Sequence, residues 1–168
     1  MSSFNTRITI FIFAILITHV FVTLPNGCDE NKTYGFVYCS NVSFHDTIEH
    51  FRGLTLDSLD FTYCSEPIGR LQSLPPINLK EFTINYCGIT EIDDAVFADV
   101  SVMPDVEVLD FAYNNITKVP SFGVKPYLTN IKLRHNLLTE INDSAFSGSR
   151  LLIIDNFVFT QTLTTPTY

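Results

Sequence analysis

Apolar residues recur at fixed positions in three segments of the chain. Within residues 79–89, 106–116 and 128–138, an aliphatic residue or Phe occupies the first, fourth, sixth and eleventh positions, and Cys or Asn occupies the ninth. The alternation at the fourth and sixth positions predicts a short strand with one buried side. Because the segments follow one another at intervals of 27 and 22 residues, they predict stacked repeats whose buried sides form one continuous core.

The order of these positions, L-x-x-L-x-L-x-x-N/C-x-L, resembles that of the extracellular leucine-rich-repeat family over residues 54–146. An earlier copy has Glu66 where an apolar residue is expected, so we expect an insertion that reaches Ile68. In a later copy the segment KVPSFGVKP contains Pro120 and Pro126, which disfavour a long helix. The resemblance implies an α/β fold: a short leucine-rich-repeat solenoid with a parallel β-sheet on its concave face and an irregular or short helical outer face.

An aromatic residue precedes the ninth position of every copy. The pairs are Tyr63-Cys64, Tyr86-Cys87, Tyr113-Asn114 and His135-Asn136. At a sharp turn the Asn side chain supplies both a donor and an acceptor to backbone groups that cannot join the sheet. Cys can replace Asn there because the thiol is small and tolerates burial. We therefore expect a ladder of turn residues formed by Cys64, Cys87, Asn114 and Asn136.

The resemblance also implies a pairing for two of the four cysteines. Cys28 and Cys39 precede the first repeat, where members of the family have a disulfide-bonded cap. Cys64 and Cys87 should lie on adjacent strands, close enough for a disulfide. Because ladder side chains point in parallel, we favour two buried free thiols there, with a second disulfide as the alternative.

The sequence divides into four parts. Residues 1–27 predict a signal peptide, because the almost wholly apolar run of 15 residues from Ile8 to Val22 is too short to cross a bilayer as a helix. Cleavage is expected between Thr23 and Gly27, and an uncleaved signal anchor is the alternative. Residues 28–53 would form the cap, 54–150 the repeats, and 151–168 an atypical tail without the cysteine-rich cap of many relatives.

The glycosylation motifs and the net charge of the chain indicate where the protein acts and which partners are excluded. Asn-X-Ser/Thr sequons occur at Asn31, Asn41, Asn115 and Asn142, which indicates a glycosylated surface in a secreted, extracellular protein. The formal net charge of −8 argues against nucleic acid or an anionic membrane as a partner.

The positions flanking the inward residues of each strand predict a binding face. In the family's geometry they point outward from the concave sheet: Ser58, Asp60, Thr62, Tyr63; Glu81, Thr83, Asn85, Tyr86; Val108, Asp110, Ala112, Tyr113; Asn130, Lys132, Arg134 and His135. The aromatic rings would stack as a column, either as packing residues or as binding residues. Acidic residues on the early repeats and basic residues on the last favour binding, since such a face can orient a partner.

Signatures of catalysis are missing from the sequence. It contains no Gly-rich phosphate loop, no C-x-x-C, no H-E-x-x-H and no G-x-S-x-G motif. A nucleophilic Cys87 assisted by His135 is conceivable, although the two lie two repeats apart. We expect neither catalysis nor a metal or cofactor, and predict a secreted module that binds a protein partner. The alternatives are a receptor ectodomain fragment, and a non-catalytic leucine-rich-repeat subunit of a secreted enzyme complex of the luciferin monooxygenase kind.

Overall fold

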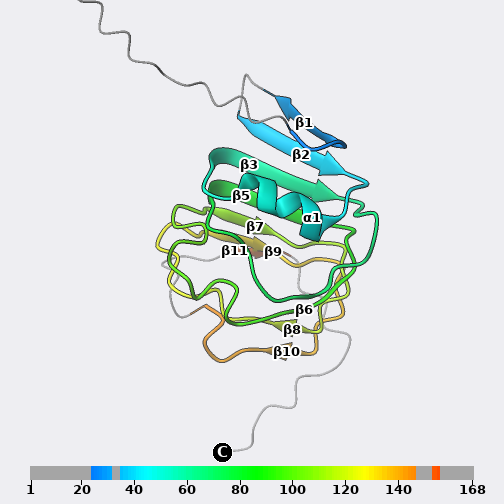
Figure 1. Ribbon diagram of the computed structural model, residues 1–168. Coiled ribbons are helices and arrows are strands. Elements are labelled where there is room, and N and C mark those ends of the chain that lie inside the picture. The colour runs from blue at the N-terminus through cyan, green and yellow to red at the C-terminus, as the bar shows by residue number, and fades with distance from the viewer. Residues whose placement is uncertain (1–23, 32–34, 147–152, 156–168) are drawn as a thin grey trace, which may run out of the picture.

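The strands of the repeats lie side by side in one sheet. A computed structural model describes residues 24–31, 35–146 and 153–155. The main sheet has seven strands in the order β1-β2-β3-β5-β7-β9-β11; β1 is antiparallel to β2, and all other neighbours are parallel (Figure 1). The strands are β1 Cys28–Asn31, β2 Phe36–Ser40, β3 Thr55–Thr62, β5 Asn78–Asn85, β7 Val108–Asp110, β9 Asn130–Lys132 and β11 Ile153–Asp155. The spatial order of the strands follows the chain, as in a solenoid.

The opposite side of the solenoid contains short strands and turns. Strand β4 (Gly69–Leu71) pairs with β6 (Ile89–Ile92), and β8 (Lys118–Val119) pairs with β10 (Glu140–Ile141). Among the described residues, helix is confined to α1 (Phe44–Ile48) and the 3₁₀ turn η1 (Glu49–Phe51). The parallel-sheet solenoid agrees with the prediction, but "α/β" overstates the helix, because the outer segments are short.

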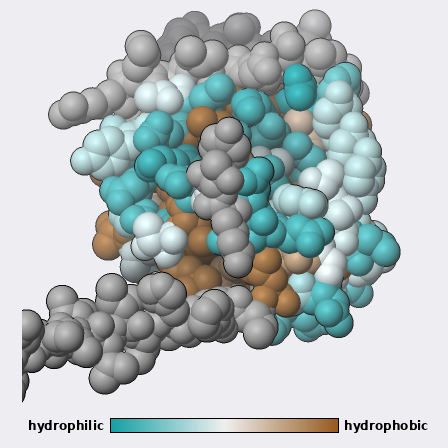
Figure 2. Space-filling model, turned by 90° about the horizontal axis from the view of Figure 1, so that it is seen from above, coloured by the Kyte–Doolittle hydropathy of each residue, from teal (hydrophilic) through white to brown (hydrophobic). Residues whose placement is uncertain are grey.

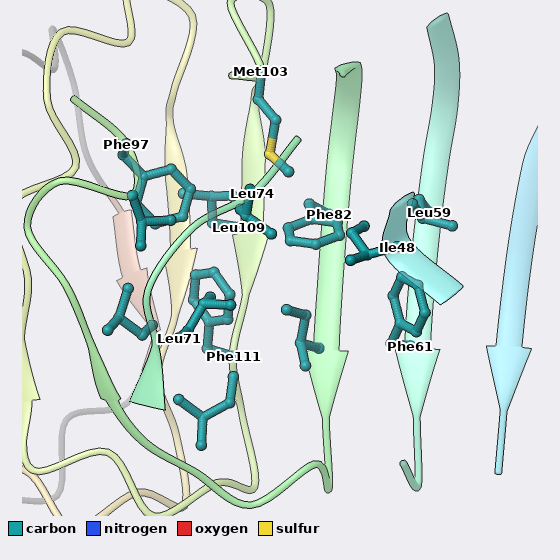
Figure 3. Close-up of a cluster of buried hydrophobic side chains, with 14 of the residues drawn as sticks. Ile48, Leu59, Phe61, Leu71, Leu74, Phe82, Phe97, Met103, Leu109 and Phe111 are labelled. Atoms are coloured by element: carbon teal, nitrogen blue, oxygen red, sulfur yellow. The ribbon is translucent and has the colours of Figure 1, made fainter. Parts of the chain in front are cut away.

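The core lies between the sheet and the outer segments. The inward residues of the repeat strands are at most 1% exposed: Leu59, Phe61, Phe82, Ile84, Leu109, Phe111, Ile131 and Leu133. Side chains of Phe82 and Phe111 extend from neighbouring strands into this layer, with ring centroids 6.5 Å apart (Figure 3). Phe97, which follows β6, closes the layer 6.2 Å from Phe111. Burying such a side chain contributes about 1.5–3 kcal/mol.

The two irregular repeats are also anchored in this core. The insertion of the first copy places Ile68 inside at 7% exposure, beside a register shift between Gly69 and Arg70. In the proline-containing segment, Phe122 is fully buried and packs 5.4 Å from the ring of Phe97. The segment includes the short strand β8 but no helix. The expected insertion and the expected lack of a long helix are both found.

Lys125, in the same proline-containing segment, is 1% exposed. Its Nζ donates to the backbone oxygens of Asp99 at 3.2 Å and Val102 at 2.5 Å. Burial lowers the pKa of Lys125, and the nearby Asp99 partly opposes that shift. This ammonium group therefore ties two outer segments together at a cost in desolvation.

The β1–β2 hairpin covers the first repeat. Cys28 and Cys39 form a disulfide across the hairpin with Cα atoms 4.0 Å apart. The buried rings of Phe44 and Phe51 pack against Phe61, with centroids 4.9 and 6.3 Å away. Seen from this end, hydrophilic residues lie beside hydrophobic ones that gather toward one edge (Figure 2). The packing of Phe44 and Phe51 leaves Phe61 fully buried.

The predicted leader falls almost wholly on residues 1–23, which lie outside the described residues. The next residues contact the fold: Leu24 packs against the core, and the Cys28 N–H donates to Pro25 O at 3.0 Å. Among the described residues, no helix is long and apolar enough to span a membrane.

Candidate recognition surface

The predicted binding residues lie together on the side of the sheet facing away from the core, here called the open face. Strand register aligns them in two rows, one formed by Ser58, Glu81, Val108 and Asn130 and the other by Asp60, Thr83, Asp110 and Lys132. The second set is called the central row. Thr62 and Asn85 are also paired, two residues further along their strands than Asp60 and Thr83. Four of the predicted positions are buried, however: Ser58, Thr83, Asp110 and Ala112 are 5%, 8%, 6% and 0% exposed and offer little surface to a partner.

Charged groups of the central row interact across strands. The Lys132 Nζ lies 3.4 Å from the Asp110 carboxylate and 3.8 Å from that of Glu81. Lys132 lies on the later strand β9, as expected, and its charge is partly neutralised by these two acidic groups. Strands only about 4.8 Å apart let the long Lys132 side chain approach acidic groups one and two strands away.

Asp60 lies near this ion-pair network without an ion pair of its own. Burial raises the pKa of its carboxyl group and the neighbouring Asp110 adds to the increase, whereas hydrogen bonds from Ser58 and Thr83 and the charge of Lys132 oppose it. The Ser58 Oγ donates to Asp60 at 2.9 Å. Within the part of the chain that the structure describes, no cationic side chain lies within 4.0 Å of Asp60. Asp60 thus presents partly buried negative charge on the open face.

Four rings form a continuous stack at the end of the repeat strands. Consecutive centroids of Tyr63, Tyr86, Tyr113 and His135, here called the aromatic column, are 4.6, 4.5 and 4.3 Å apart, with interplanar angles of 19°, 12° and 16°. The guanidinium of Arg134 lies 5.7 Å from the Tyr113 ring centroid. Tyr63 is 58% exposed and Tyr86 41%. The column predicted from the sequence is present.

Backbone geometry aligns the rings. Tyr63, Tyr86, Tyr113 and His135 have φ values of 53°, 55°, 56° and 56°. This left-handed conformation is unfavourable for a non-glycine residue by about 1–2 kcal/mol. The Tyr86 N–H donates to Tyr113 O at 3.1 Å, and the Tyr113 N–H donates to Arg134 O at 3.0 Å. Each turn is therefore bonded to the next, and the rings repeat with the spacing of the strands.

Asn114 and Asn136 form the predicted ladder beneath the column. Asn114 Oδ1 accepts from the backbone N–H groups of Cys87 and Ile89, both at 3.1 Å, and its Nδ2 donates to Ile84 O at 2.7 Å. Asn136 Oδ1 accepts from the Ile116 N–H at 2.9 Å. The carboxamides satisfy buried backbone groups that the turns leave unpaired.

Cys64 and Cys87 differ from the favoured prediction. They form a disulfide with Cα atoms 4.8 Å apart, so the expected free thiols are a mistake. Neighbouring parallel strands bring these Cα atoms within disulfide range, and side-chain rotation turns the sulfurs toward each other although the Cα–Cβ bonds repeat in parallel. The disulfide joins the turns that carry Tyr63 and Tyr86, which fixes the first two rings of the column.

Two exposed residues near this surface, Phe36 and Tyr38, were missed from the sequence. Phe36 and Tyr38 of β2 align with Ser58 and Asp60, and they are 45% and 51% exposed. Their alternation with buried Val37 and Cys39 is the signal that could have identified them. Asn41, with φ of 56°, follows β2 as Tyr63 follows β3. The open face therefore continues onto the β1–β2 hairpin.

The remaining candidate sites have limited chemistry. Cys87 cannot serve as a thiolate nucleophile while it is joined to Cys64. Within the described ranges, no three His, Cys, Asp or Glu side chains form a group able to hold a metal. A hollow near the start of β3 and β5 is lined by Asp57, Asn78 and Lys80, and the Lys80–Asp57 ion pair at 2.8 Å occupies part of it.

The four sequons lie in different settings. Asn31, Asn41 and Asn115 are exposed, whereas Asn142 is half-buried. The Asn142 Nδ2 donates to Asp94 at 2.8 Å and its Oδ1 accepts from the Ser144 N–H at 2.9 Å. In the folded chain the Asn142 carboxamide is therefore already engaged.

The sheet, the repeat ladder and the disulfides together fit a leucine-rich-repeat protein. No family model matches the chain. The chain is 35% identical over 69 residues to a leucine-rich repeat-containing G-protein coupled receptor 5 from Homo sapiens, and 33% identical over 69 residues to that of Xenopus tropicalis. Each match covers 41% of this chain and only 7% of the receptor. The similarity thus agrees with leucine-rich repeats in this part of the chain.

Proposed function

We propose that this chain is a secreted, non-catalytic leucine-rich-repeat module that binds a protein partner through its open face. The aromatic column is the observation that carries the proposal. It presents three Tyr rings and one His ring at 4.3–4.6 Å spacing, and Tyr63 and Tyr86 remain substantially exposed. Tyr combines apolar area, a polar tip and little side-chain entropy to lose on binding.

Rigidity of the column supports the same function. The Cys64–Cys87 disulfide and the Asn114 hydrogen bonds hold successive turns together before any partner arrives. A surface already ordered loses less conformational entropy on association than a flexible one. The residues beside the column add polarity, including the half-buried Asp60 carboxyl group.

The similar proteins support a recognition role, because both are named as receptors that contain leucine-rich repeats. A receptor ectodomain fragment and a secreted recognition protein would use the same kind of surface. A non-catalytic subunit of an enzyme complex would instead be found bound to a catalytic chain. The identity of the captured partner therefore separates these alternatives.

The test begins with capture of cross-linked partners from native extracellular fluid, followed by purification and titration of the captured protein. The Tyr86→Ala/Tyr113→Ala variant should weaken binding by more than about 2 kcal/mol. Tyr127→Ala is the matched control, since Tyr127 is 58% exposed but precedes β9 rather than following it. Equal binding by the wild type and a folded column variant would refute the proposal.

A further inference from the structure

Asn41 occupies the column position one strand before Tyr63. Strand register pairs Ser40 with Thr62, and Asn41 and Tyr63 are the next residues in their chains. Asn41 has φ of 56° beside 53° for Tyr63, and its N–H donates to Tyr63 O at 3.0 Å. The Tyr86 N–H donates to Tyr113 O in the same way at 3.1 Å. The backbone arrangement of the aromatic column therefore begins at Asn41, but the rings begin at Tyr63.

Tyr63 has one stacked ring among the described residues, Tyr86 at 4.6 Å. By contrast, Tyr86 and Tyr113 each have a stacked ring on both sides. The strand order places β2 on the other side of β3 from β5, so the second face of Tyr63 is turned toward the β2 turn. Its 58% exposure agrees with an uncovered ring face.

Asn41 begins the sequon Asn41-Val42-Ser43. Val42 is buried, and the Ser43 Oγ donates to Glu66 at 2.9 Å, so the residues after Asn41 are held in place. Asn41 itself is exposed, and its carboxamide has no hydrogen bond within the described part of the chain. This differs from Asn142, whose carboxamide both donates and accepts hydrogen bonds.

We propose that Asn41 carries an N-linked glycan whose first N-acetylglucosamine packs against the uncovered face of Tyr63. The inference rests on secretion, which is part of the proposed function. A pyranose presents a face of C–H groups, and an aromatic face carries negative charge density that attracts them. A group attached at Asn41 lies about one strand spacing from Tyr63, the distance at which the column places its rings.

The modification is an ordinary group transfer from a lipid-pyrophosphate-linked oligosaccharide. A bond forms between Asn41 Nδ2 and the sugar C1, while the bond from C1 to the pyrophosphate oxygen breaks. The amide nitrogen loses one proton, and the lipid pyrophosphate leaves with the electron pair of the broken bond. No oxidant or reductant takes part.

A sugar in this position would cover the aromatic column at its Tyr63 end. The sugar covers Tyr63 and stands beside the cap hairpin, while Tyr86, Tyr113 and His135 continue away from it along the sheet. A protein partner would then approach the column from the β5–β9 side.

Nuclear magnetic resonance of the full secreted chain tests the sugar contact. The chain is produced in eukaryotic cells that attach high-mannose glycans, which are then trimmed enzymatically to one N-acetylglucosamine per site. Glycopeptide mass spectrometry measures occupancy, and Asn41→Gln assigns the sugar signals. We expect nuclear Overhauser contacts between the Asn41-linked sugar and the Tyr63 ring, with sugar protons shifted upfield of those in a reference glycopeptide.

Two ring substitutions supply the controls. Tyr63→Leu should remove the upfield shift, and Tyr113→Leu should leave it unchanged. An unoccupied Asn41 in the secreted chain, or an occupied Asn41 without the wild-type sugar–ring contacts, would overturn the inference. If Tyr63→Leu fails to fold, the sugar–ring contacts of the wild-type chain still test the inference. Partner binding is measured separately. A loss of binding would count against the proposed function alone, because the sugar–ring contacts would still be observed.

Discussion

Phe111 and Tyr113 provide a direct test of which aromatic residues stabilise the fold and which bind. The two residues are two positions apart in the same repeat, but Phe111 is fully buried and Tyr113 half-buried. Phe111→Ala removes a core ring next to Phe82 and Phe97, and should lower the free energy of unfolding by about 3–5 kcal/mol.

Tyr113→Ala removes two stacked contacts, at 4.5 Å to Tyr86 and 4.3 Å to His135. Each such pair contributes about 0.5–1.5 kcal/mol, so the stacking loss is about 1–3 kcal/mol. The cation–π contact from Arg134 at 5.7 Å adds about 0.5–1 kcal/mol. Tyr113→Ala should therefore be less destabilising than Phe111→Ala while weakening partner binding.

Urea denaturation of both variants, followed by titration of the purified partner with the folded fraction, measures the two effects. A phenylalanine at position 113 is the control, since Tyr113→Phe keeps the ring stack and removes only the hydroxyl group. If Tyr113→Ala destabilises as much as Phe111→Ala and leaves partner affinity unchanged, the column consists of packing residues. The binding interpretation would then be refuted.

Three further measurements address the ladder, the second disulfide and the buried lysine. Asn114→Ala leaves two buried N–H groups unpaired and should cost about 2–6 kcal/mol in urea denaturation, whereas Asn115→Ala, at an exposed neighbour, should cost under about 0.5 kcal/mol when both are compared without glycans. Replacing Cys64 and Cys87 by Ser should cost about 3 kcal/mol for a sequence separation of 23, and non-reducing peptide mapping should show the native bridge. Because the pKa of Lys125 is lowered on folding, the unfolded chain binds its proton more tightly, so stability should rise as pH increases through that lowered pKa toward 10.5. Lys125→Met lacks this contribution, and a wild-type advantage that did not grow between pH 7 and 10 would contradict the assignment.

Periodicity in the sequence was sufficient to predict the interior. The repeat assigned inward positions such as Phe82 and Ile84, and both are fully buried. The repeat also predicted which residues of the open face lie side by side, because strands with the same pattern of positions pair in parallel register. The state of Cys64 and Cys87 depended on side-chain rotation, about which a spacing of 23 carries no information. The reach of Lys132 toward Asp110 likewise depended on how a flexible side chain extends across strands.

Energetics separate the two roles of the aromatic column only in part. Four left-handed aromatic residues at about 1–2 kcal/mol each cost about 4–8 kcal/mol, while three stacked pairs return about 1.5–4.5 kcal/mol. The turn itself accepts Asn, as Asn41 shows with φ of 56°, and Asn tolerates this conformation better than Tyr. Stacking therefore offsets much of the strain without requiring aromatic rings at every turn. Selection for a partner-binding surface would account for the remaining cost, and measured affinity at Tyr113 tests that explanation.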